Sequence, residues 1–151
     1  MKTKLTKSLS CRTVILSMML AGGLLFNASV QAAEKAGAQL KIPASSAEIW
    51  QAIDQEVEQL AVLIQAGKFE GVHHHAFAIR DLVAALPARS GSMSADKLAR
   101  VKSNGKFVAT LAERLDTAGD ARDKEETESN FRKLKSILAA IRTSYPDLIT
   151  K

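Results

Sequence analysis

The sequence predicts an all-α fold, an antiparallel up-down-up-down bundle of four helices. Four segments carry apolar residues at spacings of three and four, which places those residues in one stripe along a helix. The segments between them are short, so helices that are neighbours in sequence are expected to lie antiparallel. No segment alternates between apolar and polar residues as a half-buried strand would. Aromatic residues make up 5% of the chain, so aliphatic side chains must form most of the core, which favours closely packed helices.

The first helix is predicted to begin at Ser45 and to end at Gly67. Glu48 follows Ser45 by three residues, so the two residues can satisfy free amides at the helix start from both sides. The apolar stripe of this helix consists of Ile49, Ile53, Val57, Leu60 and Ile64.

The second helix is predicted to begin within residues 68–71 and to run to Leu86, where Pro87 stops it. A polar loop, residues 88–92, is expected to follow. The stripe consists of Val72, Ala76, Ile79, Val83 and Leu86, and is widened by His75 and Leu82.

The third helix is predicted to be capped by Ser94 and closed by Gly119. Gly105 lies on its apolar stripe, where the missing side chain could let a neighbouring helix come close. That glycine weakens the helix by about 1 kcal/mol relative to alanine. The stripe consists of Leu98, Val101, Gly105, Val108, Ala112 and Leu115.

The fourth helix is predicted to be capped by Asp123, with Glu126 three residues further on, and to end before Pro146. The charge-dense run of residues 122–126 is interpreted as its solvated start. The stripe consists of Phe131, Leu134, Leu138, Ile141 and Tyr145.

The first 32 residues have the composition of a secretory signal peptide. Basic residues precede an uncharged apolar run, residues 13–26, which is shorter than the about 20 residues that span a bilayer. Small residues at Val30 and Ala32 suit cleavage after Ala32, and Leu24 stands where a lipoprotein signal would need a cysteine. We therefore expect a soluble periplasmic protein that has no membrane anchor in its mature form.

The remaining chain divides into three predicted parts. Residues 33–44 have no apolar period and are interpreted as a flexible lead-in. The four-helix bundle is predicted to occupy residues 45–146, and residues 147–151 form a C-terminal tail.

Removal of the signal peptide changes the charge of the protein. It takes away four of the 21 Lys and Arg residues and none of the 16 Asp and Glu residues, so the net charge falls from +5 to +1. A nucleic-acid partner is not expected, because phosphate binding needs a basic surface. The single cysteine, Cys11, also lies in the signal peptide. Disulfides, thiolate metal sites, cysteine nucleophiles and thioether-linked haem are therefore excluded from the mature protein.

All three histidines of the chain, His73, His74 and His75, stand together near the start of the second helix. Successive helical residues point about 100° apart, so three adjacent histidines cannot face one ion together. Glu70 lies three residues before His73 and four before His74, which makes a carboxylate–imidazole half-site suited to zinc, copper(II) or nickel. The other ligands must come from another helix, from water or from a second molecule.

Two interpretations of this cluster remain open. In one, Glu70, His73, His74 and His75 form a metal site in a metal-handling or metal-resistance protein. In the other, His75 is a core-edge residue, His73 and His74 are ordinary solvent-facing side chains, and the bundle is a metal-free module. Such a module would present a helix face to a protein partner or to itself. Converging ligands from another helix favour the first interpretation, and exposed apolar area on the second or third helix favours the second. No catalytic motif stands elsewhere, so an enzyme is not expected.

Two segments resemble known groups of proteins. Residues 141–146 resemble the end of the last helix in periplasmic b-type four-helix cytochromes, and the architecture also resembles cytochrome c′. The b-type family has a similar arginine and tyrosine before its haem-ligating histidine, where this chain has Pro146. A Cys-x-x-Cys-His motif is absent, so the resemblance implies the architecture without haem. Residues 72–82 resemble small exported helical proteins associated with heavy-metal efflux and resistance, which implies metal handling but transfers no ligand set.

The signal peptide gives a direct prediction. N-terminal sequencing of protein recovered from the periplasm should begin at Ala33, because cleavage follows the small residues that end at Ala32. Recovery of uncleaved chain in the cytoplasm would contradict the predicted compartment.

Overall fold

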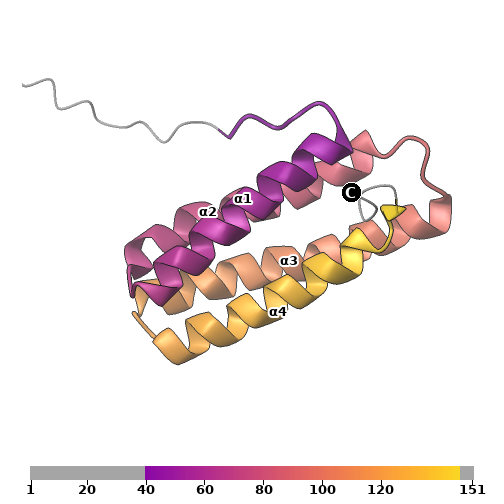
Figure 1. The fold of residues 1–151 in the computed structure, drawn as a ribbon. Coiled ribbons are helices and arrows are strands. Elements are labelled where there is room, and N and C mark those ends of the chain that lie inside the picture. Colours follow the sequence, from indigo (N-terminus) through magenta and orange to yellow (C-terminus); the bar gives the residue numbers. More distant parts are fainter. Residues whose placement is uncertain (1–39, 147–151) are drawn as a thin grey trace, which may run out of the picture. The chain divides into compact units, whose positions relative to one another are not determined.

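The structure, a computed structural model, describes residues 40–146 (Figure 1). The elements are the helices α1 (Ser46–Gln65), α2 (Val72–Ala85), α3 (Ala95–Asp120) and α4 (Lys124–Arg142), with the 3-10 turns η1 (Phe69–Gly71) and η2 (Leu86–Arg89). No strand occurs among the residues described, so the predicted all-α class is confirmed. The predicted signal peptide, most of the predicted lead-in and the predicted tail lie outside the described residues. Within residues 40–146, no helix is both long enough and apolar enough to cross a membrane.

The four helices pack around an aliphatic core. α2 packs against α1 on one side and α3 on the other, and α3 packs against α4, whereas α1 and α4 contact each other less extensively (Figure 1). Every residue of the apolar stripe predicted for α2 is buried. Leu40 and Ile42, at the end of the predicted lead-in, are partly buried against the core. The largest fully buried side chains include Ile49, Ile53, Leu60, Ile79, Leu82, Leu86, Leu115, Leu134 and Ile141.

The caps predicted for α1 and α4 are confirmed. The Ser45 hydroxyl accepts a hydrogen bond from the Glu48 amide at 3.2 Å, and the Glu48 carboxylate accepts one from the Ser45 amide at 3.1 Å. The hydrogen bond from the Ser45 side chain also lowers the pKa of Glu48. Gly67 follows α1 with a φ of 67°, a conformation that glycine adopts without strain. At the start of α4, the Asp123 carboxylate accepts a hydrogen bond from the Glu126 amide at 3.0 Å.

α3 departs from the prediction at both ends. Ser94 occupies the N-cap position, but its hydroxyl makes no capping hydrogen bond. Gly119 does not close the helix, which continues to Asp120. The left-handed conformation that ends α3 is adopted instead by Arg122, with a φ of 52°. The Arg122 amide donates to the Gly119 carbonyl at 2.9 Å and so satisfies one of the last free carbonyls of the helix.

A close approach between α3 and the start of α2 explains why glycine stands at position 119. A Cβ at this position would lie 3.2 Å from the Cβ of Val72 and 3.3 Å from the carbonyl oxygen of Phe69, closer than side chains ordinarily pack. A Cβ at Gly105 would lie 3.6 Å from Cγ1 of Val83, an ordinary van der Waals distance. Gly119 therefore has the packing role that the sequence suggested for Gly105.

The two glycines of α3 form a matched pair for mutation. Gly105→Ala is expected to raise the free energy of unfolding by about 1 kcal/mol, because alanine favours the helix and its methyl group has room. Gly119→Ala is expected to lower it by about 1 kcal/mol, because overpacking against the start of α2 outweighs the same gain in helix propensity. Urea denaturation of both variants measures the difference. Equal stabilisation by the two substitutions would contradict the close approach at Gly119.

Candidate functional site

The start of α2 is held between α1 and α3, and this fixes the position of the histidine run. A Cβ at Gly71 would lie 2.6 Å from the end of the Leu63 side chain, so the η1 turn lies close against α1 and a larger residue would require Leu63 to move. Val72, the next residue, is fully buried and lies against Gly119 of α3. Residues 73–75 follow directly, so their side chains project from a constrained first turn of α2.

His73 faces α3 and contacts a carboxylate there. Its Nδ1 lies 2.8 Å from Oδ1 of Asp116, and the two side chains are 50% and 27% exposed. Because an ionised carboxylate only accepts hydrogen bonds, Nδ1 carries the proton that is donated to Asp116. When the ring is in its neutral form, this tautomer has its lone pair on Nε2. The ring packs edge-on against Phe77 at a centroid distance of 4.7 Å and against His74 at 5.2 Å.

His75 faces α1 and makes a second contact of the same kind. Its Nδ1 lies 2.6 Å from Oε2 of Glu56, and both side chains are 26% exposed. The apolar neighbours of His75 on α2, including Ile79 and Leu82, are fully buried. His75 therefore lies at the edge of the core, as the apolar stripe predicts, and its carboxylate contact ties α2 to α1.

Glu70 does not lie in the α-helical register that the sequence suggested. It belongs to the η1 turn and is exposed. No hydrogen bond or ion pair within residues 40–146 joins Glu70 to His73 or His74. The carboxylates that contact histidines are Asp116 and Glu56, which sequence reasoning missed. They lie 43 and 19 residues from their histidines, so no local spacing could identify them.

The structure thus places the four proposed ligands around the start of α2 without gathering them about one point. In the part of the chain that the structure describes, no group of three or more His, Cys, Asp or Glu side chains is arranged to hold a metal ion. The structure instead forms two histidine–carboxylate pairs, His73 with Asp116 of α3 and His75 with Glu56 of α1, on opposite sides of α2. A carboxylate that accepts from one ring nitrogen fixes the tautomer and orientation of an imidazole, an arrangement common behind metal-binding histidines.

Comparison with known proteins adds no identification. No family model, no curated protein and no solved structure matches this chain. The resemblances to the four-helix cytochromes and to the heavy-metal resistance proteins therefore stay predictions.

The residues behind the cytochrome resemblance have partners within the fold. The Arg142 guanidinium contacts the Asp54 carboxylate and lies 4.4 Å from the centroid of the Trp50 ring. The ring of Tyr145 packs edge-on against Trp50 at 5.7 Å. Both side chains at the end of α4 thus contribute to packing between α4 and α1.

The half-buried position of His75 gives a prediction about stability. His75→Ala is expected to lower the free energy of unfolding by about 1 to 3 kcal/mol, because the substitution removes core-edge packing and leaves Glu56 without its partner. His74→Ala is the matched control and is expected to change it by less than about 0.5 kcal/mol, because His74 is exposed. Chemical denaturation followed by circular dichroism measures both, and coincident transitions would contradict this assignment.

Proposed function

We propose that this protein is an exported helical bundle that binds a transition-metal ion through His73 and His74, in a metal-handling or metal-resistance role. Zinc, copper(II) and nickel are the candidate ions, because neutral imidazole with water or carboxylate suits all three. The observation that carries the proposal is the contact between His73 Nδ1 and Asp116, which leaves the Nε2 lone pair of His73 for an ion. Haem has no part in the proposal.

The two exposed imidazoles are neighbours whose rings meet edge-on, and their separation is of the size that a shared ion needs. The ring centroids of His73 and His74 lie 5.2 Å apart. Two imidazoles bound to one tetrahedral zinc ion lie with their centroids roughly 5 Å apart, given zinc–nitrogen distances of about 2.0 Å. The remaining positions are left to water, to Glu70 or to a second molecule. His75 belongs to the cluster in sequence, and we propose that its main role is structural.

The proposal includes the location of the protein and the direction of its helices. Residues 1–32 direct export and are removed after Ala32, which leaves the protein free in the periplasm. The helices alternate in direction as an up-down-up-down bundle. This is supported by the short connections and by two close pairs between α2 and α3, Val72 with Gly119 and Val83 with Gly105. From the first pair to the second, the residue number rises on α2 and falls on α3, as expected for two helices that run in opposite directions.

We propose binding rather than catalysis. Within residues 40–146, the hydrogen bonds of the histidine rings go to carboxylates, and no serine or threonine hydroxyl is paired with an imidazole. A hydroxyl nucleophile needs such a base within reach.

The alternative function is a metal-free interaction module that binds a protein partner or a second copy through a helix face. It is favoured by the exposure of two apolar residues, Phe107 on α3, which is 57% exposed, and Val62 on α1, which is 54% exposed. Aromatic side chains exposed to this extent are common at protein interfaces.

Calorimetric titration of the exported protein with zinc, copper(II) and nickel at neutral pH tests the metal site. The double variant His73→Ala/His74→Ala is expected to lose the isotherm, because both ligands are removed. Asp116→Asn is expected to weaken binding by about tenfold or more, because the imidazole loses its carboxylate partner. His75→Ala is expected to retain binding as long as the variant folds.

The two functions are separated by the same measurements. An unchanged isotherm in the double variant would rule out this cluster as the site. In that case, self-association that is abolished by Phe107→Ser, measured by sedimentation, would support the interaction module.

A further inference from the structure

A hollow of about 540 Å³ lies between the second half of α3 and the first two turns of α4, beside the turn that joins these helices. It shares no residue with the histidine run. Asp116, the α3 residue that contacts His73, does not line it either. A ligand in this hollow would therefore bind independently of the proposed metal site.

Carboxylates outnumber cations around this hollow. Three of the residues that line it are acidic, Glu113, Asp123 and Glu126, whereas Arg114 is the one basic residue among them. The Arg114 guanidinium makes no ion pair within residues 40–146, so it leaves these carboxylates unneutralised. The hollow therefore carries a net negative charge, which favours a cationic ligand.

The hydroxyl groups that line the hollow are left as acceptors. The Thr110 hydroxyl donates to the Lys106 carbonyl at 3.2 Å, and the Thr117 hydroxyl donates to the Glu113 carbonyl at 3.0 Å. Each hydroxyl has a single proton, so both oxygens have only lone pairs to offer a ligand. Together with the carboxylates, they favour a ligand that donates hydrogen bonds.

Asn130 supplies a separate observation that points to a donor. Its side chain is fully buried, at a position that lines the hollow. Its Nδ2 donates to Oε1 of Glu126 at 2.9 Å, whereas its Oδ1 is buried and has no hydrogen-bond partner within residues 40–146. If the amide were turned round, two oxygens would face each other, so the contact with Glu126 fixes its orientation. Nearly all buried polar atoms in proteins are paired, so the unpaired oxygen indicates a donor from a bound molecule.

An ammonium group fits this set of acceptors better than a metal ion does. Within residues 40–146, no group of three His, Cys, Asp or Glu side chains is arranged to hold a metal ion, so the carboxylates around the hollow do not converge on one point. An ammonium group is compact, carries one positive charge and has three N–H donors for separate acceptors. Ala118 and Ala121 also line the hollow and offer apolar surface to an aliphatic chain.

We propose that this hollow binds a small aliphatic primary amine in its ammonium form. The ammonium group donates to Oδ1 of Asn130 and to the carboxylates of Asp123 and Glu126, and the aliphatic chain packs against Ala118 and Ala121. The bound amine thus gives the buried oxygen of Asn130 the donor that the protein itself does not supply.

Nuclear magnetic resonance titration of the ¹⁵N-labelled protein tests the proposal. The probe is n-butylammonium chloride at neutral pH, with a chelator present and sodium chloride adjusted to hold the ionic strength constant. Saturable shifts are expected at the side-chain amide of Asn130 and at the backbone amides of residues 117–126, with no change at residues 89–94. Butyltrimethylammonium has the same charge and chain but no N–H donor, so it is expected to bind at least tenfold more weakly.

A matched pair of variants separates a built site from a general charge effect. Glu126→Gln keeps an oxygen for the Asn130 amide but removes a charge from the hollow, so it is expected to weaken binding at least fivefold. Glu125→Gln removes the same charge at an exposed position in the same turn, outside the hollow, and is expected to leave the affinity unchanged. Equal affinities in the two variants would overturn the proposal.

Asn130→Leu tests the buried oxygen directly. Leucine is similar in size and has no acceptor, so the variant is expected to lose saturable binding while its urea midpoint stays the same or rises. Retained binding in this variant, shifts that fail to saturate in the unaltered protein, or equal affinity for the two ammonium ions would each contradict the proposed site. If Asn130→Leu does not fold, the comparison of the Glu126 and Glu125 variants decides the question.

Discussion

The close approach between Gly119 of α3 and the start of α2 is the constraint on which the histidine cluster depends. With no side chain at position 119, Val72 lies directly against the helix, at a distance of 3.2 Å from where a Cβ would stand. This contact fixes the register between the two helices. One turn before Gly119 on α3 stands Asp116, and one residue after Val72 on α2 stands His73, so the register brings this imidazole and this carboxylate to 2.8 Å.

The energetics of the two histidine–carboxylate pairs suggest different reasons for their presence. A side-chain pair exposed to water contributes at most about 1 kcal/mol to stability, so stability alone is a weak reason for the half-exposed pair of His73 and Asp116. The pair of His75 and Glu56 is less exposed and joins α2 to α1 beside fully buried side chains. His75 therefore helps to hold α2 in place, whereas His73 is half-exposed and is oriented by its contact with Asp116.

The parts of the fold that the sequence predicted well depend on neighbours within one turn of helix. The reciprocal cap of Ser45 and Glu48 and the left-handed Gly67 are local features, and the structure has both. The predicted end of α3 at Gly119 is wrong, because a glycine that ends a helix and a glycine that lets a neighbouring helix come close look the same in the sequence. Helical spacing likewise identifies Glu70 as the carboxylate partner of His73 and His74. Asp116 comes near His73 only because of the register between α2 and α3, which local spacing does not show.

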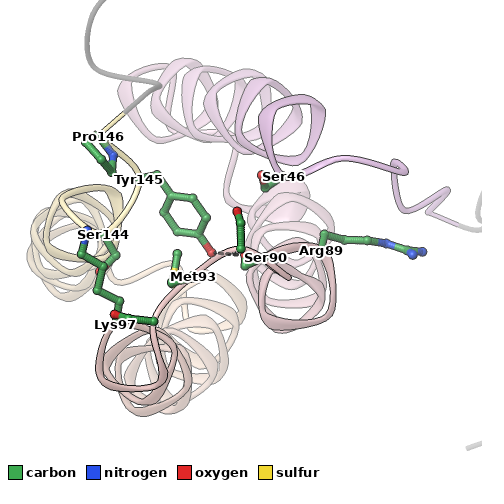
Figure 2. A pocket seen from close by; sticks show the side chains of 10 residues that line it. Ser46, Arg89, Ser90, Met93, Lys97, Ser144, Tyr145 and Pro146 are labelled. Carbon is green, nitrogen blue, oxygen red and sulfur yellow. Dashed lines mark hydrogen bonds between the residues drawn. The ribbon is translucent and has the colours of Figure 1, made fainter.

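Side chains at the end of α4 and just after it supply contacts with α1, which α4 otherwise touches little. Arg142 lies over the Trp50 ring and pairs with Asp54, and Tyr145 packs edge-on against Trp50 while its hydroxyl reaches Ser90 after α2. Aromatic residues are few in this chain, and two of them, Trp50 and Tyr145, pack together between α1 and the residues after α4. The same tyrosine lines a hollow of about 400 Å³ that lies between the starts of α1 and α3 and the residues after α4 (Figure 2). One side chain after α4 thus joins α1 to the segment that follows α2, where α1 and α4 themselves make few contacts.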